Sequence, residues 1–91
     1  ERTLTHRGIE FTGLFYNSSE LGVLRHRSRE SPKIKFRYDK ENLGYIWAYD
    51  EFEGNYLKVP CIDPDYAEGL TLRQHSQIRA EARSIGLSDQ D

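Results

Sequence analysis

The stretch that decides the fold is KIKFRYD, residues 33–39, in which cationic and apolar side chains alternate with a strict period of two. This period is typical of a β-strand with one buried and one solvated face. We expect Ile34, Phe36 and Tyr38 to face a core. The cations between them are expected to face solvent.

A hairpin is predicted to follow this strand. Residues 39–44 indicate a turn, and residues 45–50 and 56–62 alternate as two further strands. The loop between the two strands is residues 51–55, in which Gly54 supplies the unusual backbone angles of a tight turn. The side chains expected to point inward are Ile46, Ala48, Leu57 and Val59.

The segment before the central strand predicts further strands and a short helix. Residues 3–16 are rich in aromatic and β-branched residues and are broken by Gly8 and Gly13, so we expect one or two strands there. Residues 17–20 form a helix-start signal, because Ser18 or Ser19 can cap the first turn. This helix is expected to bury Leu21 and Leu24 and to end by Pro32.

The last part of the chain predicts a loop over residues 63–69 and then a C-terminal helix. Thr71 and Gln74 have the spacing of a capping box. The helix is expected to run to about Ile85, with Gly86 at its C-terminal cap. Its predicted apolar stripe is Leu72, Ile78, Ala82 and Ile85.

Several short strands separated by turn signals are typical of a small antiparallel barrel. The sequence therefore predicts a mainly β fold, with a short helix after the first strands and a C-terminal helix. The barrel is expected to occupy residues 1–70. Residues 71–91 are expected to form the helix and a tail that leads out of the domain.

Length and composition restrict the class of protein further. The 91 residues suffice for one domain, and no apolar run approaches the length of a membrane span. The chain begins at Glu1 and contains no Met, so we expect it to be an excised segment of a longer protein or a processed chain. The single Cys61 has no disulfide partner within the chain, which suits a reducing, cytoplasmic compartment.

The charge is unevenly distributed along the chain. Residues 1–40 carry nine Lys and Arg against five Asp and Glu, whereas residues 41–91 carry four against ten. This asymmetry predicts a local positive patch on a molecule whose net charge is −2.

The positive patch is the main candidate site. Residues two apart on a strand are about 6.6–7 Å apart, close to the spacing of successive DNA phosphates, so we expect contacts that are independent of base sequence. The alternative is an ordinary solvated strand face. The predicted nucleic-acid-binding residues are Arg25, Arg27, Arg29, Lys33, Lys35, Arg37 and Lys40.

A second candidate site is aromatic and consists of Tyr45, Trp47 and Tyr49. These rings are expected to be core, a contact face for a neighbouring domain, or a platform on which unpaired bases stack. The exposed side of the C-terminal helix is either solvated or a further docking surface.

No catalytic or metal site is predicted within the chain. Asp63, Asp65 and Glu68 lack the spacing of a calcium loop, and the three His and Cys61 are too scattered for zinc. We find no arrangement typical of nucleophilic catalysis and expect no cofactor in this segment.

The order of several short motifs resembles the C-terminal β-barrel domain of Mu-type DNA transposases, the family of the TnsB, TniA and phage Mu transposases. The motifs are Arg7-Gly8-Ile9, Tyr16 followed by SSELGVL, and KFRYD followed by Asn42-Leu43-Gly44. Val59-Pro60-Cys61 and the stretch AEGLTL, residues 67–72, complete the series. The resemblance covers about Arg2 to Ile85.

This resemblance implies a six-stranded barrel that follows an RNase H-like catalytic domain. The parent would be a bacterial or phage-encoded DDE transposase that joins DNA strands with divalent metal bound in its catalytic domain. The segment itself would contact DNA and act as a scaffold. As an alternative, it would be a protein-interaction barrel that docks the catalytic domain, another transposase subunit or an AAA+ target-selection ATPase. None of Asp39, Asp50 and Asp63 corresponds to the family's catalytic acids.

Overall fold

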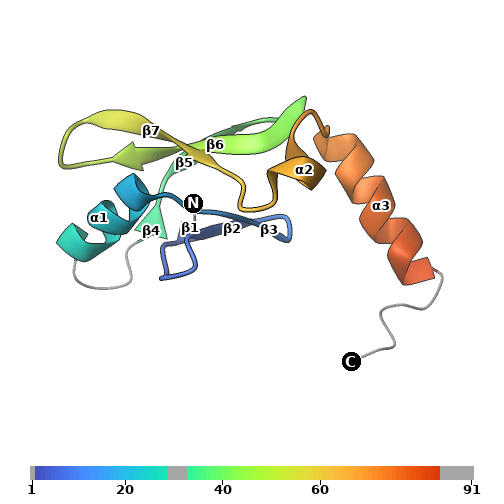
Figure 1. Cartoon of the computed structure of the whole chain (residues 1–91), viewed down its shortest axis with the longest axis horizontal. Coiled ribbons are helices and arrows are strands. Elements are labelled where there is room, and N and C mark those ends of the chain that lie inside the picture. The colour runs from blue at the N-terminus through green and yellow to red at the C-terminus, as the bar shows by residue number, and fades with distance from the viewer. Residues whose placement is uncertain (1, 29–32, 85–91) are drawn as a thin grey trace.

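The computed structural model describes residues 2–28 and 33–84. Within them a mainly β fold carries a helix at each end of the molecule (Figure 1). The elements in chain order are β1 (Arg2–Thr3), β2 (Ile9–Phe11), β3 (Leu14–Tyr16), α1 (Ser19–Ser28), β4 (Lys33–Ile34), β5 (Phe36–Asp39), β6 (Asn42–Asp50), β7 (Asn55–Pro60), α2 (Pro64–Ala67) and α3 (Leu72–Ser84). The predicted mainly β class with a C-terminal helix is confirmed.

The expected closed six-stranded barrel is wrong for the described residues. Their strands form three antiparallel sheets with the orders β1-β4, β2-β3 and β5-β6-β7. The central segment changes partner at Lys35, since β4 pairs with β1 and β5 pairs with β6. Isolated contacts join the sheets, such as the bridge between Tyr16 and Cys61. Strands of two or three residues are too short to carry a continuous ladder around a barrel.

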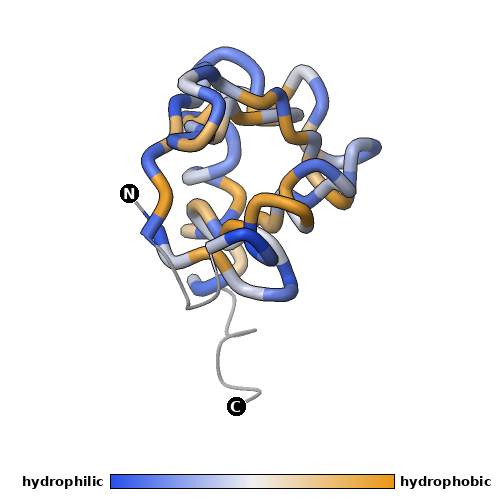
Figure 2. Tube along the Cα trace, turned by 90° about the vertical axis from the view of Figure 1, so that its left-hand side faces the viewer, coloured by the Kyte–Doolittle hydropathy of each residue, from blue (hydrophilic) through white to orange (hydrophobic). Residues whose placement is uncertain are grey.

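One hydrophobic core lies between the sheets, and Tyr16 is its largest fully buried side chain. The Tyr16 side chain is fully buried, and its hydroxyl donates to the Leu43 carbonyl oxygen. Seen from the side, the chain curves around this core, with hydrophobic positions recurring along the trace (Figure 2). The other fully buried large side chains are Leu4, Ile9, Leu21, Leu43, Ile46 and Val59.

The N-terminal segment forms three short strands where one or two were expected. The break at Gly8 has a steric cause: its φ is 96°, and a Cβ there would lie 2.0 Å from the Tyr16 carbonyl oxygen. Helix α1 follows as predicted, with the Ser18 hydroxyl accepting from the Leu21 amide at 3.1 Å. Leu21 and Leu24 are both buried, which confirms the predicted inner face. Pro32 lies outside the described residues.

The central hairpin is confirmed, with altered bounds. Strand β6 begins at Asn42, so the turn before it is shorter than residues 39–44. Gly54 has φ 74° in the loop between β6 and β7, as expected. Tyr38 points toward the inner side but is 45 % exposed, because β5 is an edge strand and its ring packs at the margin on Phe11.

The C-terminal part confirms the capping box and corrects the apolar stripe. The Thr71 amide donates to Gln74 Oε1 at 2.9 Å, and the Gln74 amide donates to Thr71 Oγ1 at 3.0 Å. Ile78, expected to be buried, is 43 % exposed. The side chain that α3 buries is His75. The predicted loop over residues 63–69 contains helix α2, and Ile85 and Gly86 lie outside the described residues.

His75 attaches α3 to the rest of the molecule. Its Nε2 lies 2.7 Å from the Thr12 carbonyl oxygen, and its Nδ1 lies 2.7 Å from the Tyr66 hydroxyl. Because a carbonyl only accepts, Nε2 carries the proton, and in the neutral ring Nδ1 accepts from Tyr66. Arg79 adds a hydrogen bond to Thr12 Oγ1 at 3.2 Å. Helix α3 is therefore held by polar contacts to the β2–β3 turn, together with Leu72, which packs against the core.

Candidate nucleic-acid interface

The register of the three-stranded sheet places the cationic and aromatic candidates on the same face. Ile46 and Ala48 of β6 are fully buried, so the alternate residues of β6 point to the outer side. Arg37 of β5 pairs with Trp47, and Trp47 pairs with Lys58 of β7. Residues paired across strands share a face. The outer face thus carries the Trp47 ring between the cations Arg37 and Lys58.

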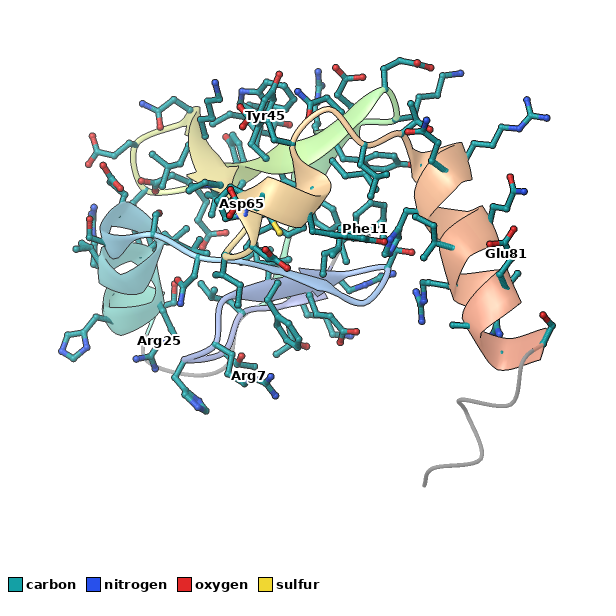
Figure 3. All side chains as sticks on the ribbon, turned by 45° about the vertical axis from the view of Figure 1, so that its right-hand side comes forward. Arg7, Phe11, Arg25, Tyr45, Asp65 and Glu81 are labelled. Carbon is teal, nitrogen blue, oxygen red and sulfur yellow. The ribbon has the colours of Figure 1, made fainter. Side chains whose placement is uncertain are left out.

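The neighbouring row across the three strands contains one cation and two rings. The Tyr49 amide donates to the Lys35 carbonyl oxygen, which sets these residues side by side, and Tyr49 pairs with Tyr56 of β7. Tyr45 lies beyond Trp47 on the same strand and extends to the outer side (Figure 3). We define the aromatic–cationic face as Lys35, Arg37, Tyr45, Trp47, Tyr49, Tyr56 and Lys58.

The rings of this face contact one another and the cations. Tyr45 and Trp47 pack edge to face with centroids 4.8 Å apart, and Tyr49 and Tyr56 lie 5.1 Å apart. Lys58 Nζ is 4.3 Å from the Tyr45 ring centroid. A cation–π contact orients a cation without cancelling its charge.

Tyr56 and Lys58 were not among the predicted site residues. The Arg37 guanidinium carbon lies 5.1 Å from the Tyr56 ring centroid, and Tyr56 is 41 % exposed. The signal was present in the alternation of residues 56–62, where both residues fall opposite the inward Leu57 and Val59. Only the pairing of β7 with β6 shows that these two residues lie beside the rings of β6.

The predicted cations of the central strand lie together and are exposed. Lys33 and Lys35 line a cleft of about 140 Å³ with Tyr49 and Glu51. Among the described residues, no carboxylate lies within ion-pair distance of Lys33, Lys35 or Arg37. Glu51 is the acidic side chain at this end of the face.

The cations of α1 do not join this group. Arg27 pairs with Glu53 of the β6–β7 loop at 3.4 Å and lies over the Phe52 ring. Arg25 extends from α1 on the opposite side of the molecule from Tyr45 (Figure 3). Arg29 lies outside the described residues.

Lys40 lies at the other end of the sheet, close to the start of α3. It lines a cleft with Thr71 and Arg73, and its carbonyl oxygen accepts from the Leu72 amide at 2.8 Å. The six predicted cations that the structure describes therefore divide into one cluster, formed by Lys33, Lys35 and Arg37, and separate positions at Arg25, Arg27 and Lys40.

Two of the carboxylates that the sequence left without a role, Asp50 and Asp39, cap turns. Asp50 is buried, and its Oδ1 accepts from the Phe52 and Glu53 amides. Asp39 Oδ1 accepts from the Glu41 amide. Within residues 2–28 and 33–84, no group of three or more His, Cys, Asp and Glu side chains is arranged to hold a metal ion.

Cys61 is the remaining reactive side chain. It is buried, and burial raises the pKa of its thiol, which disfavours the nucleophilic thiolate. Across the part of the chain that the structure describes, no helix has the length and apolarity needed to cross a membrane.

Comparison with protein families identifies one match. The sequence model of the family described as Mu transposase, C-terminal, matches residues 1–58. The chain belongs to the Mu transposase C-terminal family. The matched residues of this family domain run from β1 to Lys58 of β7, so they include every member of the aromatic–cationic face. No curated protein matches the chain.

Family membership gives the chain a transposase-related role. The C-terminal domain of a Mu transposase is a non-catalytic region of that protein. The motifs described above are therefore read as parts of a module that serves transposition.

Proposed function

We propose that this Mu transposase C-terminal domain contacts DNA through its aromatic–cationic face and acts as a non-catalytic scaffold of a DDE-type transposase. The observation that carries the proposal is the row Arg37, Trp47, Lys58, which spans three paired strands on an outer face. Cations on this face are exposed, and a polyanion is the ligand that they suit.

The expected contacts are to phosphates and are independent of base sequence. Lys35 directly precedes β5 and Arg37 lies within it. Two residues of extended chain span about 6.6–7 Å, a separation that follows successive phosphates. Lys33, two residues before Lys35, extends this line of cations along the chain. The parent's catalytic domain would hold the divalent metal and perform strand transfer in the cytoplasm of a bacterium, within a transposase oligomer.

A salt titration of DNA affinity tests the proposal. Replacing Lys35 and Lys58 with Gln keeps part of each aliphatic stem and removes two charges. The slope of log K against log salt concentration should then become less steep by up to about 1.8, since each phosphate contact contributes about 0.9. The matched control replaces Arg73 and Arg83 of α3 with Gln and should keep the original slope.

The measurement is fluorescence anisotropy of a labelled duplex at several salt concentrations. An unchanged slope in the Lys35, Lys58 variant would show that DNA does not meet this face. Equal loss of slope in both variants would show that net charge alone matters, and would likewise contradict the proposed site.

A second candidate function is protein docking through α3, favoured by one observation. Ile78 is exposed on the helix that projects from the sheets (Figure 1), beside a cleft of about 340 Å³ lined with Leu70 and Glu81. The partner would be the catalytic domain, another subunit or an AAA+ ATPase. Ile78→Glu would then abolish assembly of the parent transposase while the DNA affinity of this chain stays unchanged.

A further inference from the structure

The aromatic–cationic face carries more aromatic surface than phosphate contacts require. Its rings lie on the central strand β6 and on β7, whereas Arg37 lies on β5, Lys58 on β7 and Lys35 directly before β5. Adjacent strands are about 4.8 Å apart, so the two cations of the row Arg37, Trp47, Lys58 are separated by roughly 10 Å at the backbone. A ring occupies the space between them.

The core does not account for these rings. The inner side of β6 supplies Ile46 and Ala48 to the hydrophobic core, whereas Tyr45, Trp47 and Tyr49 are half-buried on the outer side. The side of the sheet from which Tyr45 extends faces solvent (Figure 3). The contacts that half-bury these rings include those with one another and with Lys58.

Half-buried rings between cations, on a face open to solvent, match one form of DNA better than another. In a duplex, the faces of the bases are covered by neighbouring bases, and only base edges and phosphates are accessible. In unpaired DNA, the base faces are free and stack on aromatic side chains, while cations follow the backbone. The absence of a described carboxylate partner for Arg37 and Lys58 favours a polyanion over a protein surface.

Resting on the proposed function, we propose that the aromatic–cationic face binds unpaired DNA by stacking bases on Trp47 and its neighbouring tyrosines. The phosphates on either side are held by Lys35, which directly precedes β5, by Arg37 on β5 and by Lys58 on β7. The face is therefore selective for single-stranded or locally opened DNA, and duplex DNA contacts its cations alone.

The test compares the chain's affinity for an oligothymidine single strand with its affinity for a duplex of equal length. Trp47→Leu removes the ring and keeps an apolar side chain. We expect single-strand affinity to fall about 5- to 150-fold, the equivalent of one lost stacking contact, while duplex affinity stays within about twofold. Retained duplex binding also shows that the variant is folded.

Two control variants sharpen the comparison. Trp47→Phe keeps a smaller π face and should recover part of the single-strand affinity. Phe52→Leu removes an exposed ring from the β6–β7 loop, outside the face, and should change neither affinity. Trp47 is also the single tryptophan, so its fluorescence should be quenched by the single strand and not by the duplex.

The outcomes separate this inference from the function on which it rests. If the unsubstituted chain binds neither form of DNA, the proposed function itself is contradicted. If it binds duplex DNA and Trp47→Leu leaves single-strand affinity unchanged, or lowers both affinities equally, stacking is contradicted and phosphate contact stands.

Discussion

Replacing Tyr16 with Phe should destabilise the fold far more than the loss of one oxygen atom suggests. The Tyr16 hydroxyl donates to the Leu43 carbonyl oxygen at 2.5 Å and so joins β3 to β6. Phe keeps the ring and its apolar packing, but it leaves the carbonyl without this donor. A buried polar group without a partner costs about 1–3 kcal/mol, so the free energy of unfolding should fall by that amount.

Urea denaturation followed by circular dichroism measures this change. In a thermal melt, the midpoint should fall by roughly 4–8 °C for each kcal/mol lost. The matched control is Tyr38→Phe, since Tyr38 is half-exposed and its ring stays in contact with Phe11. The control should change the free energy of unfolding by less than about 0.5 kcal/mol. Equal small effects in both variants would refute the role given to the buried hydrogen bond.

The same residue predicts a dependence on alkaline pH. Burial raises the pKa of the Tyr16 hydroxyl well above its ordinary value of 10.0, and the neighbouring Cys61 adds to the shift. The unfolded chain therefore loses this proton first, so the stabilisation is complete below about pH 10 and declines as the pH rises further. The difference in stability between the natural chain and Tyr16→Phe should shrink above that pH. A difference in stability that stays constant above about pH 10 would contradict the burial of the Tyr16 hydroxyl.

Three further predictions follow from single contacts. Gly8→Ala should lower the free energy of unfolding by more than about 2 kcal/mol, because the added Cβ would collide with the Tyr16 carbonyl oxygen. Gly54 also has a positive φ but open space around it, so Gly54→Ala should lower the free energy of unfolding by only about 1 kcal/mol. Chemical denaturation measures both changes. Thr71→Ala removes the cap of α3 and should cost about 1 kcal/mol in the same assay. His75→Leu removes both polar contacts of the helix, so amide hydrogen exchange should quicken in α3 and stay slow in β6; uniform exchange rates would contradict this attachment.

Local signals in the sequence were sufficient for the elements whose contacts are local. The capping box of Thr71 and Gln74 is made within one helical turn, and the loop at Gly54 is set by residues adjacent in sequence. The inward Ile46 and Ala48 follow from the pleat of one strand. Each of these predictions depends on dihedral angles and hydrogen bonds over a few residues.

The predictions that failed depended on contacts between distant segments. The strand partner changes at Lys35, so the central segment does not form one continuous barrel strand. The alternation of residues 33–39 gives no signal of this change. Ile78 has the spacing of a buried residue, but α3 is held instead by the contact of His75 with Thr12, far away in sequence.

The candidate site was predictable in composition and not in arrangement. The cations of residues 33–37 and the rings of β6 were recognised as two separate features. The cations were predicted to contact DNA, and the rings to be core, a domain-contact face or a platform for unpaired bases. Only the pairing of Arg37, Trp47 and Lys58 across the sheet makes them one face. The register between β5, β6 and β7 depends on all three strands and their turns together, so the sequence of one strand does not determine it.

The central claim is that DNA meets the outer side of the β5–β6–β7 sheet. Nuclear magnetic resonance of the labelled chain during titration with DNA tests it most directly. We expect the largest shifts at the Trp47 indole N–H and at the backbone amides of Arg37 and Lys58, with α3 unaffected. Shifts concentrated around Ile78, with the sheet unaffected, would contradict the claim.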